Sequence, residues 1–345
     1  MSCKPLGTSS MNSDPAPFEL LPWQQAQWLQ LVDRRERLSF PHALLLSGPA
    51  GVGKRQFAAR LAAALVCEQE TISAQPCGAC RACNLATSGT HPDIQWLEPE
   101  EEGKAIRIDA VRALIGRSTL TTQARGSRVF LISPAHAMNR AAANALLKTL
   151  EEPTASSTLV LISSEPHRLP ATIRSRCQEM VFRPVAPAQA ESWLAARVDS
   201  EQRGALLSLT GGAPLQVLRA VEENWLEHAE ESVAKLVDLK QRKINPMHVV
   251  KHWADRPLES VLNDIARACS DLLHLGTGAG QPRLFLPRVR NELQSLANDI
   301  NLQGLYRFTD ELNLLRRQMS HNLNSQMVLE KLVTDWLALT RPGAR

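Results

Sequence analysis

The residues with the clearest chemical signature run from Gly48 to Lys54 and read G-P-A-G-V-G-K. Glycines at this spacing let a chain turn with its backbone N–H groups facing inward, and the lysine adds a positive charge. The apolar run Ala43–Leu46 predicts a buried strand before them, and Gln56–Val66 predicts a helix after them. Strand, G-x-x-x-x-G-K and helix form the pattern of a phosphate-binding P-loop. The candidate nucleotide-binding residues are Gly48, Pro49, Ala50, Gly51, Val52, Gly53, Lys54 and Arg55.

Nucleotide turnover would require further groups that the sequence lacks. The position after the lysine should carry a Ser or Thr hydroxyl that holds Mg²⁺, and here it is Arg55. An acidic residue should follow a neighbouring strand, but the predicted strand Arg128–Ile132 is followed by Ser133 and Pro134. Because hydroxyl and carboxylates are missing together, we expect a degenerate loop that can still hold ATP or ADP without turning ATP over. An active ATPase, suggested by Lys54, is the alternative.

Four of the seven cysteines lie close together, at Cys67, Cys77, Cys80 and Cys83. C-x2-C pairs place two thiolates on one ion, and four cysteines are a typical set for structural Zn²⁺. A redox C-x-x-C would leave two cysteines unexplained, and an iron–sulfur cluster would usually end in a Cys-Pro that is absent here. Structural zinc over residues 67–83 is the favoured interpretation, with the other two as alternatives.

Arg176 belongs to the triplet Ser175-Arg176-Cys177, just before the predicted strand Glu179–Phe182. An arginine on a loop is usually a solvated surface residue. An arginine offered to the nucleotide of a neighbouring subunit can instead stabilise γ-phosphate charge and accelerate hydrolysis by about 10³–10⁵-fold. Spacing alone favours the surface interpretation.

The elements that would position these groups alternate between strands and helices in the first half of the chain. Further strands are predicted at Ile94–Leu97 and Thr158–Ile162, and helices at Trp23–Leu38, Ile108–Arg117 and Asn139–Glu152. This alternation predicts an α/β fold in which helices wrap a parallel sheet.

Strand signals disappear after residue 187, where short helices are predicted over 188–197, 201–209 and 215–228, followed by a longer all-helical segment. We expect a flexible tail over residues 1–17 and an α/β domain over 18–185. A small helical lid is expected over 186–228, and an all-α domain over 229–345.

Composition narrows the class of protein. The 345 residues are 44% hydrophobic and 21% charged, which predicts a packed core, and the net charge of +4 is too balanced to indicate nucleic-acid binding by charge alone. The sequence has neither an apolar run long enough to cross a membrane nor a signal-peptide core, so we expect a cytoplasmic protein without a membrane partner.

Taken together, the P-loop, the four cysteines, N-A-L-L-K-T-L-E-E-P at Asn144–Pro153 and the S-R-C triplet resemble the AAA+ subunits of the bacterial DNA polymerase III clamp loader. The likeness covers most of residues 19–220 and implies an AAA+ domain, a helical lid and a C-terminal oligomerisation collar. Motor subunits of that family keep the P-loop hydroxyl, an Asp-Glu pair after the strand matching Val129–Ile132, and a lid arginine near Leu215. The sequence lacks all three, so it is similar to the stationary, delta-prime type of subunit.

The resemblance also implies a role for several residues. It makes Arg176 an arginine finger acting in trans and makes the four cysteines the ligands of a zinc module. The implied partners are motor subunits of the gamma/tau type, the delta clamp-opening subunit and, through the complex, the sliding clamp and primed DNA. The chain would thus belong to a DNA-directed DNA polymerase holoenzyme, although no polymerase site is visible. A zinc-dependent DNA-binding protein is less favoured because the cysteine segment carries only Arg81 as a base.

Overall fold

The chain forms two compact units, Met1–Ala190 and Glu191–Arg345. The computed structural model describes residues 18–37, 39–69, 75–101, 103–116, 128–153, 157–278, 283–318 and 324–340. The predicted tail over residues 1–17 therefore lies outside the described residues, as do residues 70–74 of the predicted zinc module.

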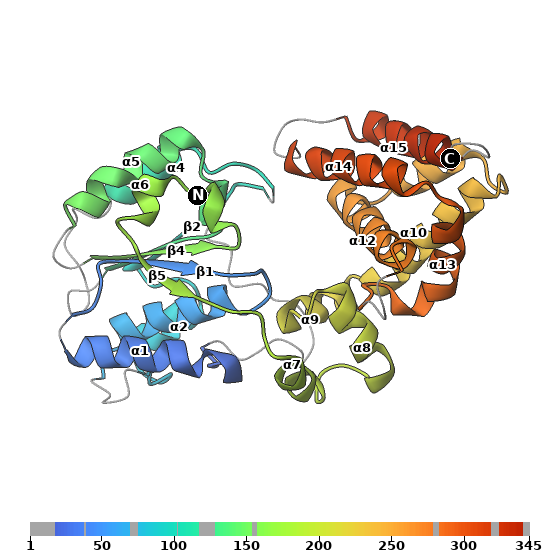
Figure 1. Cartoon of the computed structure of the whole chain (residues 1–345). Coiled ribbons are helices and arrows are strands. Elements are labelled where there is room, and N and C mark those ends of the chain that lie inside the picture. The colour runs from blue at the N-terminus through green and yellow to red at the C-terminus, as the bar shows by residue number, and fades with distance from the viewer. Residues whose placement is uncertain are drawn as a thin grey trace. The chain divides into compact units, whose positions relative to one another are not determined.

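The first unit is built on a five-stranded sheet in which every pairing is parallel, with the strand order β2-β3-β4-β1-β5 (Figure 1). The strands are β1 (Ala43–Ser47), β2 (Ile94–Leu97), β3 (Arg128–Ile132), β4 (Ser157–Ser163) and β5 (Gln178–Val181). All five agree with the predicted strands to within two residues. Because the strands are parallel, the loops that follow them meet at one edge of the sheet, and the segments that precede them lie at the opposite edge.

Helices cover both faces of this sheet. In Figure 1, α1 (Gln25–Glu36) and α2 (Lys54–Val66) lie on one face, and α4 (Ile108–Gly116), α5 (Arg140–Glu151) and α6 (Ala171–Arg174) lie on the other. The short helix α3 (Arg81–Thr87) packs against α2. The described residues of this unit also form the 3-10 turns η1 (Pro22–Gln24), η2 (Ala135–Ala137) and η3 (Pro166–Arg168).

The core follows from the alternation of side chains along β1. Ala43 and Leu45 belong to a buried cluster with Leu146 and Leu150 of α5, and this cluster fills one side of the sheet. The helix α5 begins where the Asn139 side chain accepts a hydrogen bond from the Ala142 amide at 2.8 Å, which satisfies one of the unpaired donors of its first turn.

The second unit is helical throughout the part that the structure describes. The helix α7 (Pro187–Leu194) leads into it, and the others are α8 (Ser200–Leu209), α9 (Pro214–Glu222), α10 (Trp225–Lys240), α11 (Pro246–Ala254), α12 (Leu258–Gly276), α13 (Arg290–Asp299), α14 (Leu302–Gln318) and α15 (Ser325–Leu339), with the 3-10 turn η4 (Pro287–Val289). The single helix predicted over 215–228 is wrong. Asn224 has the left-handed φ of 52°, which ends α9 and starts α10 in a new direction. The expected boundary between residues 228 and 229 falls inside α10.

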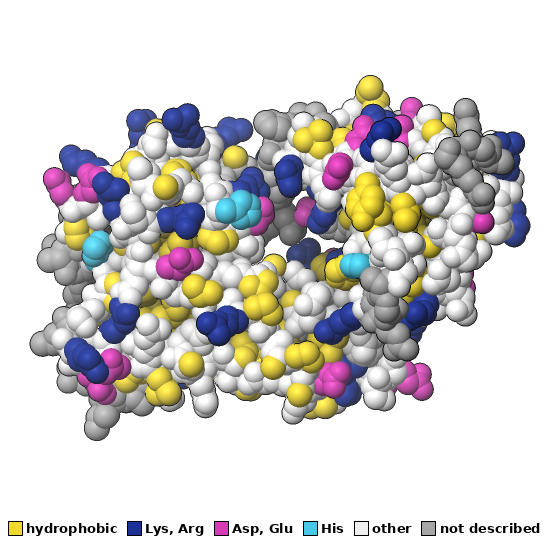
Figure 2. All heavy atoms as spheres, in the orientation of Figure 1, with side chains coloured by type: hydrophobic (Ala, Val, Ile, Leu, Met, Phe, Trp, Pro, Cys, Tyr) yellow, Lys and Arg dark blue, Asp and Glu magenta, His cyan; other side chains and the backbone are white. Residues whose placement is uncertain are grey.

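The surface gives two further findings. Among the described residues, no helix combines the length and the apolar character needed to cross a bilayer. On the face shown in Figure 2, the Lys and Arg side chains are spread among neutral, apolar and acidic ones and do not form one continuous basic patch.

Candidate functional site

The P-loop residues take the backbone conformation that the glycines predict. Gly48, Gly51 and Gly53 have φ values of 138°, 75° and 85°. At Gly48, a Cβ atom would lie 2.0 Å from the Phe182 carbonyl oxygen, so packing as well as backbone conformation requires glycine there. The Lys54 side chain bends back into the loop, where Nζ donates hydrogen bonds to the carbonyl oxygens of Gly48 at 2.7 Å and Pro49 at 2.6 Å.

Two side chains from the N-terminal segment hold the loop from outside. Gln24 Nε2 donates to the carbonyl oxygens of Val52 at 3.0 Å and Gly53 at 2.9 Å, and Trp23 Nε1 donates to Val52 O at 3.0 Å. Gln24 is fully buried. Neither residue is recognisable from the sequence, because nothing local marks a glutamine or tryptophan 28 or 29 positions away as a contact of the loop.

Arg55, which stands where a magnesium-binding hydroxyl is usual, is engaged elsewhere. It forms an ion pair with Glu98, and its guanidinium lies over the Trp96 ring at 4.3 Å from the centroid. Trp96 is on β2, and Glu98 directly follows this strand. The side chain after Lys54 therefore links the start of α2 to the end of β2 and offers no ligand to a divalent cation.

The residues that follow β3 and β4 form a network of polar contacts around His136, and no Asp-Glu pair follows β3. Ser133 and Pro134 follow β3. Beyond them, His136 Nδ1 lies 3.1 Å from Ser163 Oγ at the end of β4, and its Nε2 lies 3.5 Å from Glu165. Burial lowers the pKa of His136, and the Glu165 carboxylate opposes that effect. Glu165 is a carboxylate at this edge that no sequence motif marks, and it pairs with His136 and with Arg168, each at 3.5 Å.

Arg176 lies at the opposite edge of the sheet from the P-loop. It precedes β5, whose first residue Gln178 pairs with Leu44, whereas the P-loop follows Ser47 at the other end of β1. Four to five strand residues at about 3.3 Å each separate the two edges by about 13–16 Å. Arg176 is 37% exposed, and its guanidinium contacts Glu151 at 2.7 Å and the Thr172 carbonyl at 3.0 Å. The arginine is thus a partly exposed surface group at the end of the strands opposite its own P-loop.

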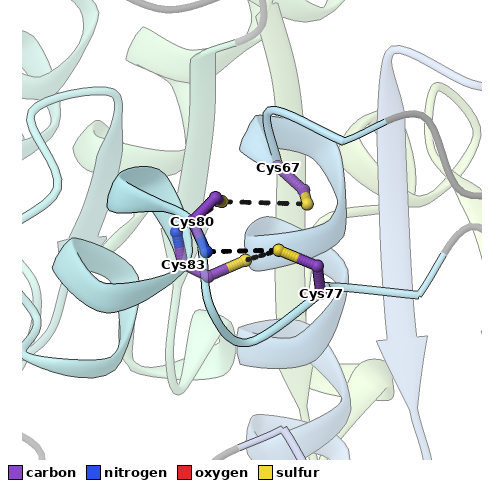
Figure 3. A group of neighbouring side chains, drawn as sticks. All are labelled: Cys67, Cys77, Cys80 and Cys83. Carbon is purple, nitrogen blue, oxygen red and sulfur yellow. Dashed lines mark hydrogen bonds between the residues drawn. The ribbon is translucent and has the colours of Figure 1, made fainter.

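The structure brings together the four cysteines that the sequence singled out (Figure 3). Cys67 ends α2, Cys77 precedes a turn, Cys80 caps the N-terminus of α3, and Cys83 lies in its first turn. Their sulfur atoms all lie within 4.8 Å of one another, with Cys67 and Cys80 at 4.0 Å and Cys77 and Cys83 at 3.9 Å.

These distances fit one tetrahedral metal ion. With Zn–S bonds of about 2.3 Å, the sulfurs of a regular tetrahedron lie about 3.8 Å apart. The backbone amides of Cys80 and Cys83 donate to Cys77 Sγ and Cys80 Sγ, both at 3.3 Å. Hydrogen bonds from the backbone of Ala79 and Cys80 favour the thiolate form of Cys77 and lower its pKa to about 6, whereas burial raises the pKa of Cys83. The cluster could therefore bind a metal ion.

Comparison with known proteins gives the family. Residues 23–186 match a family described as DNA polymerase III, delta subunit, and residues 200–338 match one described as DNA polymerase III, delta subunit, C terminal. The DNA polymerase III subunit delta' of Pseudomonas aeruginosa is 38% identical over 330 residues, which are 94% of this chain and 99% of that protein. The chain belongs to the DNA polymerase III delta-prime subunit family. The parallel sheet wrapped by helices and the helical segments that follow it confirm the predicted fold class, an α/β domain followed by helices.

Other relatives match over a shorter stretch. The delta' subunit of Escherichia coli is 36% identical over 207 residues, 59% of this chain and 62% of that protein. The DNA polymerase III subunit tau of Bacillus subtilis is 32% identical over 188 residues, 54% of this chain and 33% of that protein. Among solved structures, a Thermotoga maritima protein described as DNA polymerase III, gamma subunit-related, is 16% identical with a TM-score of 0.44, over 90% of this chain and all of that one.

Proposed function

We propose that this chain is the stationary subunit of a clamp loader that places the sliding clamp on primed DNA at the expense of ATP. In this role it does not turn over ATP itself. It donates Arg176 to the nucleotide of an adjacent gamma/tau-type motor subunit and, with the delta subunit, completes a cytoplasmic hetero-oligomer.

The position of Arg176 is the observation that carries this proposal. A guanidinium at the amino edge of the sheet cannot act on a phosphate held about 13–16 Å away at the carboxyl edge. A partly exposed arginine at that place can instead meet a ligand on a neighbouring molecule, where it would stabilise charge on a γ-phosphate. Its ion pair with Glu151 is a surface contact of small free energy, so the side chain is free to exchange partners.

The residues at the P-loop edge of the sheet support the proposal that this chain does not hydrolyse ATP itself. Hydrolysis requires a Mg²⁺ ion held between a loop hydroxyl and an acidic residue. Here Arg55, which is paired with Glu98, stands where the loop hydroxyl would be. Ser133 and Pro134 stand where the acidic residue would follow β3. A chain with this edge would serve a neighbour's active site and lack one of its own.

The four cysteines would hold a structural zinc ion within this assembly. All four ligand positions would be filled by sulfur, so the ion would have no open position for catalysis. It would supply a cross-link that fixes the end of α2 to the start of α3, where the described residues between these helices include few buried apolar side chains.

The test of the arginine finger uses Arg176→Ala in a reconstituted loader, with Arg174→Ala as the matched control. Arg174 is an exposed arginine on α6, two residues away. We expect both variants to assemble normally. Only Arg176→Ala should slow hydrolysis at the adjacent motor site, by about 10³–10⁵-fold at that site. Single-turnover kinetics would resolve the slow site from the others.

An unchanged single-turnover rate in the Arg176→Ala loader would refute the proposed role of Arg176 as an arginine finger. Equal losses in both variants would also count against it, because a general electrostatic effect of this surface would then explain the change.

A further inference from the structure

The backbone that carries Arg176 is fixed by the core of the first unit. Ile173 and Cys177, which flank it in the sequence, are both buried and belong to the apolar cluster that also contains Leu146 and Leu150 of α5. The Arg176 amide donates to the Ile173 carbonyl oxygen at 3.1 Å. The side chain itself leaves the core and is 37% exposed, so contacts at the surface decide where its guanidinium lies.

Two contacts orient this guanidinium. Its Nη1 donates to the Thr172 carbonyl oxygen at 3.0 Å, and its Nη2 lies 2.7 Å from Glu151 Oε1. Thr172 is on α6 and Glu151 is the last residue of α5, and these two helices pack against each other on one face of the sheet (Figure 1). A guanidinium is planar and has five donors, so contacts to two of its nitrogen atoms hold its plane and leave other N–H groups for a further acceptor.

Glu151 contributes little to the stability of the fold. The carboxyl end of a helix carries a partial negative charge, which disfavours a carboxylate at this place. Its pair with Arg176 is half-exposed, and such pairs add little to the free energy of unfolding. The preceding residue, Leu150, is buried in the same apolar cluster as Ile173 and anchors the end of α5. The core therefore places the Glu151 carboxylate beside Arg176 although neither the helix nor the fold gains much from it.

We propose that Glu151 is a positioning residue for Arg176, an inference that rests on the proposed role of Arg176 as an arginine finger. Before the neighbour's nucleotide is met, the Glu151 carboxylate and the Thr172 carbonyl hold the guanidinium in one orientation, with its remaining N–H donors available to a γ-phosphate. An arginine that is not held samples many rotamers, and this freedom is lost when it binds. An exposed pair of small free energy orients the side chain without preventing the exchange of partners that the finger requires.

The experiment measures single-turnover ATP hydrolysis at the adjacent motor site of a reconstituted loader that contains Glu151→Ala. We expect hydrolysis to be about three- to tenfold slower than with the parent chain, because one orienting contact is lost while the Thr172 carbonyl remains. The ATP concentration that gives the half-maximal rate should not change, because Glu151 contacts Arg176 and not the nucleotide. The matched control is Glu152→Ala, which removes an exposed carboxylate from the next residue and should leave both quantities unchanged.

Three further measurements separate the orientation of Arg176 from a general effect on the fold. In the Arg176→Ala background, Glu151→Ala should cause no additional loss of rate, because its effect passes through the arginine. Urea unfolding should show that Glu151→Ala is as stable as the parent, because α5 loses a carboxylate from its negative end. Nitrogen relaxation of the Arg176 Nε–H group, measured by NMR on the isolated chain and assigned by its absence in Arg176→Ala, should show a more mobile side chain in Glu151→Ala.

An equal or faster rate in Glu151→Ala, in a loader that Arg176→Ala slows, would overturn the role of Glu151 and leave the proposed function intact. The role of Glu151 would also be overturned by equal slowing in Glu152→Ala, by a further loss in the Arg176→Ala background, by a clear loss of stability, or by unchanged mobility of the Arg176 side chain. If Arg176→Ala itself has no effect on the rate, the proposed function fails, and the positioning role fails with it.

Discussion

Replacing Cys80 by serine tests whether the cysteine cluster is a zinc site. Cys80 lies at the centre of the cluster, since its sulfur is 4.0 Å from Cys67 Sγ and accepts the Cys83 amide at 3.3 Å. Serine has almost the same shape but is a poor ligand for zinc. We therefore expect Cys80→Ser to lose most of the metal that the parent protein retains after purification.

The destabilisation expected on losing the metal depends on the length of the segment that the ion would cross-link into a loop. Cys67 and Cys83 are the ends of a 17-residue stretch. Closing a loop of that length by a cross-link removes about 3 kcal/mol of chain entropy from the unfolded state. The loss of that term should appear as local opening between α2 and α3, with faster proteolysis and faster amide exchange there, and with little change in the sheet.

The assay is metal content by plasma emission spectrometry, combined with limited proteolysis. Arg81→Ala is the matched control because Arg81 is exposed and adjacent to Cys80 but supplies no sulfur. We expect one zinc per chain in the parent and in Arg81→Ala. Equal zinc content in Cys80→Ser would refute the four-ligand site, and iron with a visible absorption band would show a different metal centre.

Two further predictions concern buried charges. Lys54→Met should stabilise the protein in phosphate-free buffer, because burial of the charged lysine lowers its pKa from 10.5 to about 8. This shift corresponds to a destabilisation of at most about 3 kcal/mol. Solvent screening and the loss of two hydrogen bonds in the variant reduce the expected gain to about 1 kcal/mol. Between pH 8 and 10.5 the folded parent binds fewer protons than the unfolded parent, so its free energy of unfolding should rise with pH over this range. The stability advantage of the variant should therefore disappear by pH 10.5, which urea unfolding at several pH values would show. Asp264→Asn should cost about 3–5 kcal/mol, because Arg256 and Arg267 would keep buried charges without their carboxylate. Urea unfolding checks this cost against the exposed control Asp310→Asn, and equal stability of the two variants would contradict it.

The sheet could be predicted from the sequence because its strands are short, continuous apolar runs. Ile94–Leu97 and Arg128–Ile132 were predicted at the bounds that the structure shows. A fully buried parallel strand leaves this signal because both of its faces need apolar side chains. The break at Asn224 could not be predicted, since a single left-handed residue other than glycine leaves no pattern in a helical sequence.

The candidate site could be predicted only where its residues are close in the sequence. The P-loop and the cysteine cluster are local motifs with fixed spacing, so both were found. The contact of Arg55 with Glu98 joins residues 43 positions apart and depends on how β2 lies in the sheet. The same holds for the pair of Arg176 with Glu151, which forms only because the end of α5 lies near α6.

The central claim is that this chain serves the active site of a neighbour and lacks one of its own. Steady-state ATP hydrolysis in Mg²⁺ tests it most directly when measured for the isolated chain, for the motor subunits, and for the two combined. We predict no turnover above background by the chain alone and a higher rate when it joins the motor subunits. Sustained magnesium-dependent hydrolysis by the isolated chain, abolished by Lys54→Met, would contradict this account.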